Sequence, residues 1–179
     1  MKKPAQYHPI LVVIHWVIAA LVFLMLLVGL FYLKYMPNAD AKIPILAIHM
    51  VIGITLIFLS LARLVVRFST KLPAPAKSGN AFFDLLGSVT HMLLYMGVLA
   101  MGLSGMGAAT QAGLMDIVFG RSGAPLPPNL YIFPARIGHG YVALGLLALI
   151  ALHLAGAAYH QFLRKDNLIA RMSLRKPKP

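Results

Sequence analysis

The sequence predicts an all-α membrane protein, a bundle of four transmembrane helices with both termini in the cytoplasm. Three observations lead to this prediction. Apolar residues make up 60% of the chain and charged residues only 11%, whereas about 25% of the residues of soluble domains are charged. Four apolar windows are long enough to cross a hydrocarbon core, which takes about 20 helical residues. Lysine and arginine lie almost entirely between or at the ends of these windows.

The four helices are expected at residues 11–33, 43–66, 84–108 and 137–160. Basic residues lie before the first helix and at the end of the second. The first follows Lys2 and Lys3 without an A-x-A-like cleavage site, so we expect a retained span rather than a signal peptide. The second carries Arg63 and Arg67 at its end, where long basic side chains reach the lipid headgroups.

A proline-rich segment precedes the third predicted helix, and another precedes the fourth. The segment RFSTKLPAPAKSGN precedes the third helix and GRSGAPLPPNLYIFP precedes the fourth. Proline interrupts helices, and charged residues oppose burial in lipid, so we predict that both segments are loops. No internal repeat is evident and no room remains for a soluble domain, so residues 1–179 are expected to form a single four-helix domain.

The orientation follows from the distribution of basic residues. An up-and-down bundle with both termini on one side places twelve basic residues on that side and four on the other. The excess predicts that the side with the termini is cytoplasmic. The same topogenic charge, together with headgroup contacts, accounts for the formal net charge of +12. We therefore expect a lipid bilayer as partner and no nucleic acid.

Histidines recur at matched depths in the predicted spans. With a rise of about 1.5 Å per residue, His15 and His153 lie near the cytoplasmic side, and His49 and His139 near the outer side. Fourteen residues at about 100° each bring His139 and His153 to one face of the fourth helix. Two flat macrocycles with axial imidazoles, stacked across the membrane, need this arrangement. Core imidazoles that hydrogen-bond to neighbouring groups remain the alternative on this evidence.

Several other cofactor classes are disfavoured by composition. The chain has no cysteine, which excludes disulfides, cysteine-ligated iron–sulfur clusters and thioether-attached haem. Zinc and non-haem iron sites normally recruit carboxylates or cysteines. The only acidic residues are expected at helix ends or in loops, namely Asp40, Asp84, Asp116 and Asp166. Their positions also disfavour a carboxylate proton pathway within the bundle.

Four segments carry a resemblance to a known family. They are IHW at 14–16, AIHMVIGITLIFLSLARLVVR at 47–67, THMLLY at 90–95 and LHLAGAAYHQFLRKDNLIARM at 152–172. Over nearly its whole length the chain resembles the bacterial cytochrome b561 family, and it is most similar to the branch that includes superoxide oxidase. The resemblance implies a protein of the bacterial inner membrane that binds two b-type haems without covalent attachment, each through two histidines.

The resemblance also implies roles for individual histidines. His15 and His153 match the ligands of the cytoplasmic-side haem, and His49 and His139 those of the periplasmic-side haem, in agreement with the pairing by depth. His160 matches a histidine associated with a quinone site. Contact with lipid headgroups is the alternative for this residue.

Three further positions bear on the implied haem and quinone sites. Arg164 stands where the family pattern has a tryptophan before KDN, so quinone packing departs from that pattern. His91 has no ligand role in the pattern, and we expect it to pack beside the cytoplasmic haem, with replacement of His15 as the alternative. Arg63 and Arg67 either face the haem propionates or reach the headgroups.

The implied activity is that of a superoxide:quinone oxidoreductase, which oxidises periplasmic superoxide to dioxygen and passes electrons to ubiquinone. Basic residues on the outer side would attract the superoxide anion, and the candidates are Arg136, Lys34, Lys42 and Arg121. One alternative is a cytochrome b subunit that links a periplasmic dehydrogenase, hydrogenase or cytochrome to the quinone pool. Another is a cofactor-free transporter or membrane scaffold.

Overall fold

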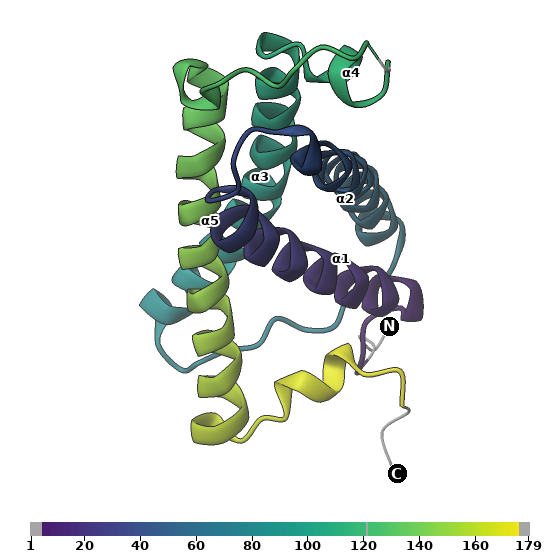
Figure 1. The fold of residues 1–179 in the computed structure, drawn as a ribbon. Coiled ribbons are helices and arrows are strands. Elements are labelled where there is room, and N and C mark those ends of the chain that lie inside the picture. Colours follow the sequence, from purple (N-terminus) through teal and green to yellow (C-terminus); the bar gives the residue numbers. More distant parts are fainter. Residues whose placement is uncertain (1–4, 121, 176–179) are drawn as a thin grey trace.

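The computed structural model describes residues 5–120 and 122–175, in which four long helices carry the chain back and forth (Figure 1). The long helices are α1 (Pro9–Leu27), α2 (Ile43–Ser69), α3 (Ala81–Gln111) and α5 (Pro134–Ala158). Two of them continue as π-helical turns, α1 into η1 (Val28–Leu33) and α5 into η4 (Tyr159–Arg164). The shorter elements are η2 (Asp40–Lys42), α4 (Leu114–Val118), η3 (Leu130–Ile132) and η5 (Leu168–Met172).

The four predicted spans are confirmed, and all of them are longer than the apolar windows suggested. The helical segments long and apolar enough to cross a membrane are 9–33, 40–69, 81–111 and 134–164. The additional residues at the helix ends are polar or lie next to a capping side chain, so a search for apolar windows leaves them out. The side chain of Asn80, for example, accepts a hydrogen bond from the Phe82 amide at the start of α3. Beyond α3, Gly113 takes a left-handed conformation with φ 64° and starts α4, which the sequence did not predict.

The helices pack through small apolar cores and meet lipid with apolar side chains. Helix α5 lies along α3, and α1 crosses beside α2 (Figure 1). A methyl group at Gly102 on α3 would run into the Ile57 side chain of α2, so glycine permits this close approach. Large apolar side chains such as Phe68, 84% exposed, cover the outside. Acyl chains are the natural solvent for such a surface.

Both described chain ends lie at the same end of the bundle, which we call the terminal end (Figure 1). The C-terminal segment folds back under α1 and is tied by hydrogen bonds to this helix and to the residues that precede it. The Gln6 side chain donates to the Ala170 carbonyl at 2.9 Å, and the Trp16 indole donates to the Met172 carbonyl at 2.9 Å. We call the opposite end, which holds α4 and η3, the distal end.

Candidate functional site

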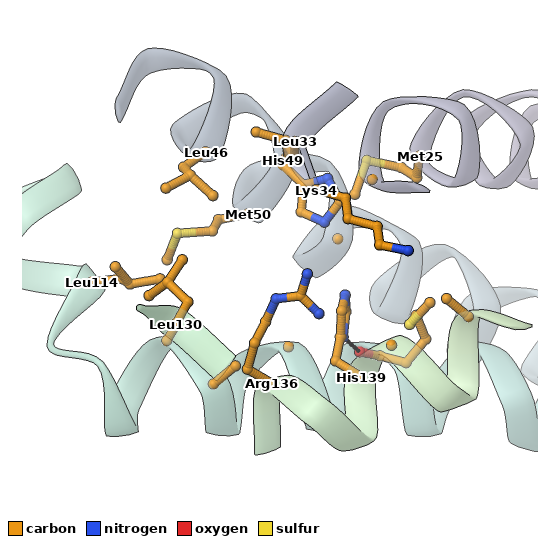
Figure 2. A pocket seen from close by; sticks show the side chains of 18 of the residues that line it. Met25, Leu33, Lys34, Leu46, His49, Met50, Leu114, Leu130, Arg136 and His139 are labelled. Carbon is orange, nitrogen blue, oxygen red and sulfur yellow. Dashed lines mark hydrogen bonds between the residues drawn. The ribbon is translucent and has the colours of Figure 1, made fainter. Parts of the chain in front are cut away.

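A cavity of about 860 Å³ opens between the helices in the distal half of the bundle (Figure 2). Its volume falls in the range of small-molecule sites, roughly 300–1,000 Å³. His49 from α2 and His139 from α5 face each other across it, with ring centroids 6.2 Å apart and planes at 70°. The structure thus brings together the two histidines that the sequence paired on the distal side.

Two local features orient His139. The Nδ1 atom of His139 lies 3.1 Å from the Met101 carbonyl and 3.2 Å from the Ser104 hydroxyl. A carbonyl only accepts, so Nδ1 carries the hydrogen and leaves Nε2 available as a ligand. Glycine at position 105 admits the ring, because a Cβ there would lie 3.2 Å from His139 Cε1. The Nδ1 atom of His49 is buried without a hydrogen-bond partner.

A second histidine cluster lies toward the terminal end. His15 of α1 and His153 of α5 have ring centroids 6.3 Å apart, with planes at 76°. His91 of α3 is nearer to His153, at 5.1 Å, and its Nδ1 donates to the Gly87 carbonyl at 2.8 Å. This cluster therefore contains the predicted terminal-side pair and the histidine whose role the sequence left open.

The ring separations test whether these pairs fit the axial positions of one metal. With metal–imidazole bonds of about 2.0 Å and ring nitrogens about 1.1 Å from the ring centre, opposite ligands have centroids about 6.2 Å apart. The His49–His139 and His15–His153 separations fit this geometry, whereas the His91–His153 separation is too short. Within the described residues no group of three or more His, Asp or Glu side chains is placed to hold a bare metal ion. Each of the two pairs would suit a cofactor that takes two imidazole ligands.

Arg63 lies beside the terminal histidine cluster. Its guanidinium hydrogen-bonds to the Tyr95 hydroxyl and sits over that ring, with Cζ 5.0 Å from the centroid. Its Nε is buried without a partner, so this buried donor is left for a further acceptor. Arg67 is one helical turn nearer the terminal end. Sequence reasoning missed Tyr95, although its position four residues after His91 puts both on the same side of α3.

His160 lies in the π-helical turn η4 and is held by a residue that sequence reasoning did not connect with it. Its Nδ1 is 2.7 Å from Oδ2 of Asp166. Asp166 is the first acidic residue after the fourth span, which was the available signal. The Arg164 guanidinium packs elsewhere, against Gly79, where a Cβ would lie 3.5 Å from Nη1.

The four basic candidates on the distal side differ in their placement. Lys34 and Arg136 point into the distal cavity beside the histidine pair (Figure 2), and Arg136 also donates to the Tyr131 hydroxyl at 3.1 Å. Lys42 is only 5% exposed, and its ammonium donates to the Met36 carbonyl at 2.9 Å and to Asn38 Oδ1 at 2.8 Å. Its charge therefore ties down the loop between α1 and α2. Arg121 lies outside the described residues.

Comparison with known proteins agrees with this architecture. The family described as prokaryotic cytochrome b561 matches residues 6–173. The chain is 30% identical over 178 residues to cytochrome b561 homolog 2 of Escherichia coli (strain K12), covering 96% of this chain and 93% of that protein. Family membership implies b-type haem, electron transport, and contact with quinone and lipid. This chain therefore belongs to the prokaryotic cytochrome b561 family and is a multi-pass electron-transfer protein of the inner membrane.

Proposed function

We propose that this cytochrome is a superoxide:quinone oxidoreductase, which takes electrons from superoxide on the periplasmic side and delivers them to ubiquinone on the cytoplasmic side. The observation that carries the proposal is the pair of cations, Lys34 and Arg136, that face the distal cavity next to His49 and His139. A small anion that enters this cavity meets positive charge directly beside the predicted ligands, and such charge raises its local concentration.

Four histidines are proposed as axial ligands of two b-type haems. His49 and His139 would hold the distal, periplasmic-side haem, and His15 and His153 the terminal, cytoplasmic-side haem. The ring separations of 6.2 Å and 6.3 Å support this assignment. When bound, the haems supply one-electron redox chemistry and carry charge across the bilayer. The chain contributes ligation, orientation and a water-poor environment around the imidazoles.

The basic residues are proposed to have separate roles. Arg136 and Lys34 attract superoxide, whereas Lys42 holds the loop between α1 and α2, because its ammonium is already hydrogen-bonded there. Arg63 is proposed to pair with a haem propionate through the Nε that has no other partner. Arg67 is the further propionate candidate, one turn along α2.

Ubiquinone is proposed to bind at the terminal end, where His160 contacts a quinone oxygen. Arg164 is a weaker candidate than the sequence suggested, because its guanidinium lies against Gly79. Two superoxide anions give up one electron each and leave as dioxygen. The quinone takes up these two electrons and two protons from the cytoplasmic side to become the quinol, so atoms and charge balance.

Stopped-flow mixing of the purified protein with superoxide tests the proposal. The haem absorption bands should show reduction without quinone, followed by rapid reoxidation when ubiquinone is present. The reduction rate should fall with ionic strength, because surface and cavity charges attract the anion. The variant Arg136→Gln should lower this rate and weaken its salt dependence, whereas Arg175→Gln, at the terminal end, serves as the charge-matched control. Haems that superoxide does not reduce would exclude the proposed activity.

A second candidate is an electron-transfer subunit that receives electrons from a periplasmic protein. Exposed side chains on the distal loops favour it, with Tyr35 72% and Ile132 65% exposed, because apolar and aromatic patches also form protein interfaces. In that case superoxide would leave the haems oxidised, while a periplasmic dehydrogenase, hydrogenase or cytochrome would reduce them.

A further inference from the structure

We propose that Asp166 and His160 form a proton-transfer dyad, in which Asp166 positions the imidazole and stabilises its protonated form while His160 donates the proton. The inference rests on the proposed reduction of quinone at the terminal end. It adds Asp166 as a positioning residue for His160 and specifies that the proton passes from His160 to the quinone.

The contact between the two side chains has the geometry of a charge-assisted hydrogen bond. His160 Nδ1 and Asp166 Oδ2 are 2.7 Å apart, at the short end of the range for such bonds. An ionised carboxylate only accepts, so the hydrogen is on Nδ1 and Nε2 is the atom left to face another molecule. The Oδ1 atom of Asp166 is buried and has no hydrogen-bond partner. The imidazole of His160 is therefore the side chain to which this carboxylate hydrogen-bonds.

The backbone is bent to make this contact. His160 lies in the π-helical turn η4, and such turns are frequent at functional sites. The two residues that flank Asp166, Lys165 and Asn167, both have φ 55°, a left-handed conformation that is uncommon for residues other than glycine. The Asp166 amide donates to the His160 carbonyl at 3.3 Å. The chain thus turns directly after η4 and returns the carboxylate to the imidazole.

Neighbouring charged and aromatic groups have other partners or roles. Asp84 of α3 is close enough to interact electrostatically with His160. Its Oδ1, however, already accepts hydrogen bonds from the Ser78 amide and hydroxyl, both at 2.7 Å. The Tyr159 ring stands perpendicular to the imidazole, with centroids 5.7 Å apart. Arg164 packs against Gly79. Asp166 is thus the carboxylate that hydrogen-bonds to His160.

The arrangement defines a proton-transfer cycle. The imidazolium carries hydrogen on both nitrogens and is stabilised by the Asp166 carboxylate. When the quinone receives an electron, the Nε2–H bond breaks and an O–H bond forms on the quinone oxygen, leaving a neutral imidazole with hydrogen on Nδ1. Cytoplasmic water then returns a proton to Nε2. A second electron and a second proton complete the quinol, and both electrons originate from superoxide.

Kinetics of three variants, Asp166→Asn, His160→Gln and the double variant, test the dyad. With Asp166→Asn, superoxide should reduce the haems at the wild-type rate, whereas reoxidation at saturating ubiquinone should slow about tenfold or more. The ubiquinone concentration at half-saturation should change little, because positioning affects proton transfer rather than binding. The double variant should be no slower than the slower single variant. Asp166→Glu should recover part of the rate, and Asp116→Asn, at the distal end, should leave it unchanged.

Two kinetic outcomes would overturn the dyad: a wild-type reoxidation rate in Asp166→Asn, or single effects that multiply in the double variant. Failure of the proposed function is visible separately, because wild-type haems would then not respond to superoxide or to quinone. Nitrogen NMR of the dithionite-reduced protein gives a readout that needs no quinone. At a pH at which the imidazole is neutral, wild-type His160 should carry its single ring hydrogen on Nδ1, and Asp166→Asn should weaken that preference. An unchanged tautomer distribution would also contradict the proposal.

Discussion

At the scale of single residues, neighbouring groups support the proposed haem ligands unequally. The Nδ1 atom of His139 has a backbone partner in Met101, whereas that of His49 has none. Beside the terminal pair, Arg63 brings a cation that Tyr95 holds in place. Side chains that surround a ligand orient it and tune the centre that it binds. Each site therefore offers its own residue-level test.

Replacement of His139 by leucine should remove the distal haem and retain the terminal one. Leucine fills a similar space but cannot ligate, and His15 and His153 belong to the other cluster. Haem content per chain, measured as the pyridine haemochrome, should fall from two to one. His8→Leu is the matched control, because His8 only caps the start of α1. Retention of both haems by His139→Leu would contradict the assignment.

Replacement of Tyr95 by phenylalanine should lower the midpoint potential of the terminal haem. A nearby cation favours the reduced form of a centre, and loss of the hydroxyl frees the Arg63 guanidinium to move away. Potentiometric titration should show a downward shift on the order of 59 mV, a tenfold change for a one-electron couple. Arg63→Gln should shift the potential further in the same direction, and Arg67→Gln less. An unshifted or raised potential in both Tyr95→Phe and Arg63→Gln would refute this role.

At the scale of elements, the helices bring their backbones close to the imidazoles. Helix α3 approaches His139 at Gly105, and the turn η1 approaches His49 at Gly29, where a Cβ would lie 3.5 Å from Cε1. The π-helical turns η1 and η4 lie beside the distal cavity and at His160, respectively. Such turns change which side chains face inward over a few residues. Sequence spacing sets the depth of each histidine in the membrane. The close helix approaches and the π-helical turns then determine which groups surround it.

Gly105→Val should displace the His139 ring and cause loss of the distal haem. A Cβ at this position would lie 3.2 Å from His139 Cε1 and 3.4 Å from Nδ1, and the valine methyl groups would come closer still. The absorption spectrum and haem content should report one remaining haem. Gly145→Val on α5 is a suitable control, because a Cβ there meets nothing within 4 Å. Wild-type haem content in Gly105→Val would show that the close approach is not needed.

At the scale of the whole molecule, charge and apolar surface define how the protein sits in the membrane. The described chain ends meet at the terminal end, where Gln6 and Trp16 are tied to the C-terminal segment. The excess of basic residues at this end predicts that it faces the cytoplasm. The distal cavity, with Arg136 and Lys34, would then open toward the periplasm, as the proposed superoxide reaction requires.

Reporter fusions test this orientation. Alkaline phosphatase, which is active only after export, should be active when fused after Pro125 in the distal loop. It should be inactive when fused after Arg175, whereas green fluorescent protein fused there should fluoresce. The reverse pattern would place the terminal end outside and would contradict both the orientation and the proposed direction of electron transfer.

The four spans, their order and the depths of the histidines follow from the amino-acid sequence alone. Span length is set by bilayer thickness, and a regular rise and rotation per residue convert spacing along a helix into position. The pairing of His139 with His49 and of His153 with His15 was therefore predictable before any contact was known, while ligation itself remains a prediction.

Which polar groups meet depends on the packing of the helices and turns in three dimensions. The contacts of Asp166 with His160, of Tyr95 with Arg63 and of Lys42 with its own loop depend on turns and on packing between helices. A one-dimensional pattern does not encode the left-handed residues that return Asp166 to His160 or the close approach that glycine permits at position 105. Helical periodicity places a side chain along and around its own helix, but neighbouring elements determine its partner.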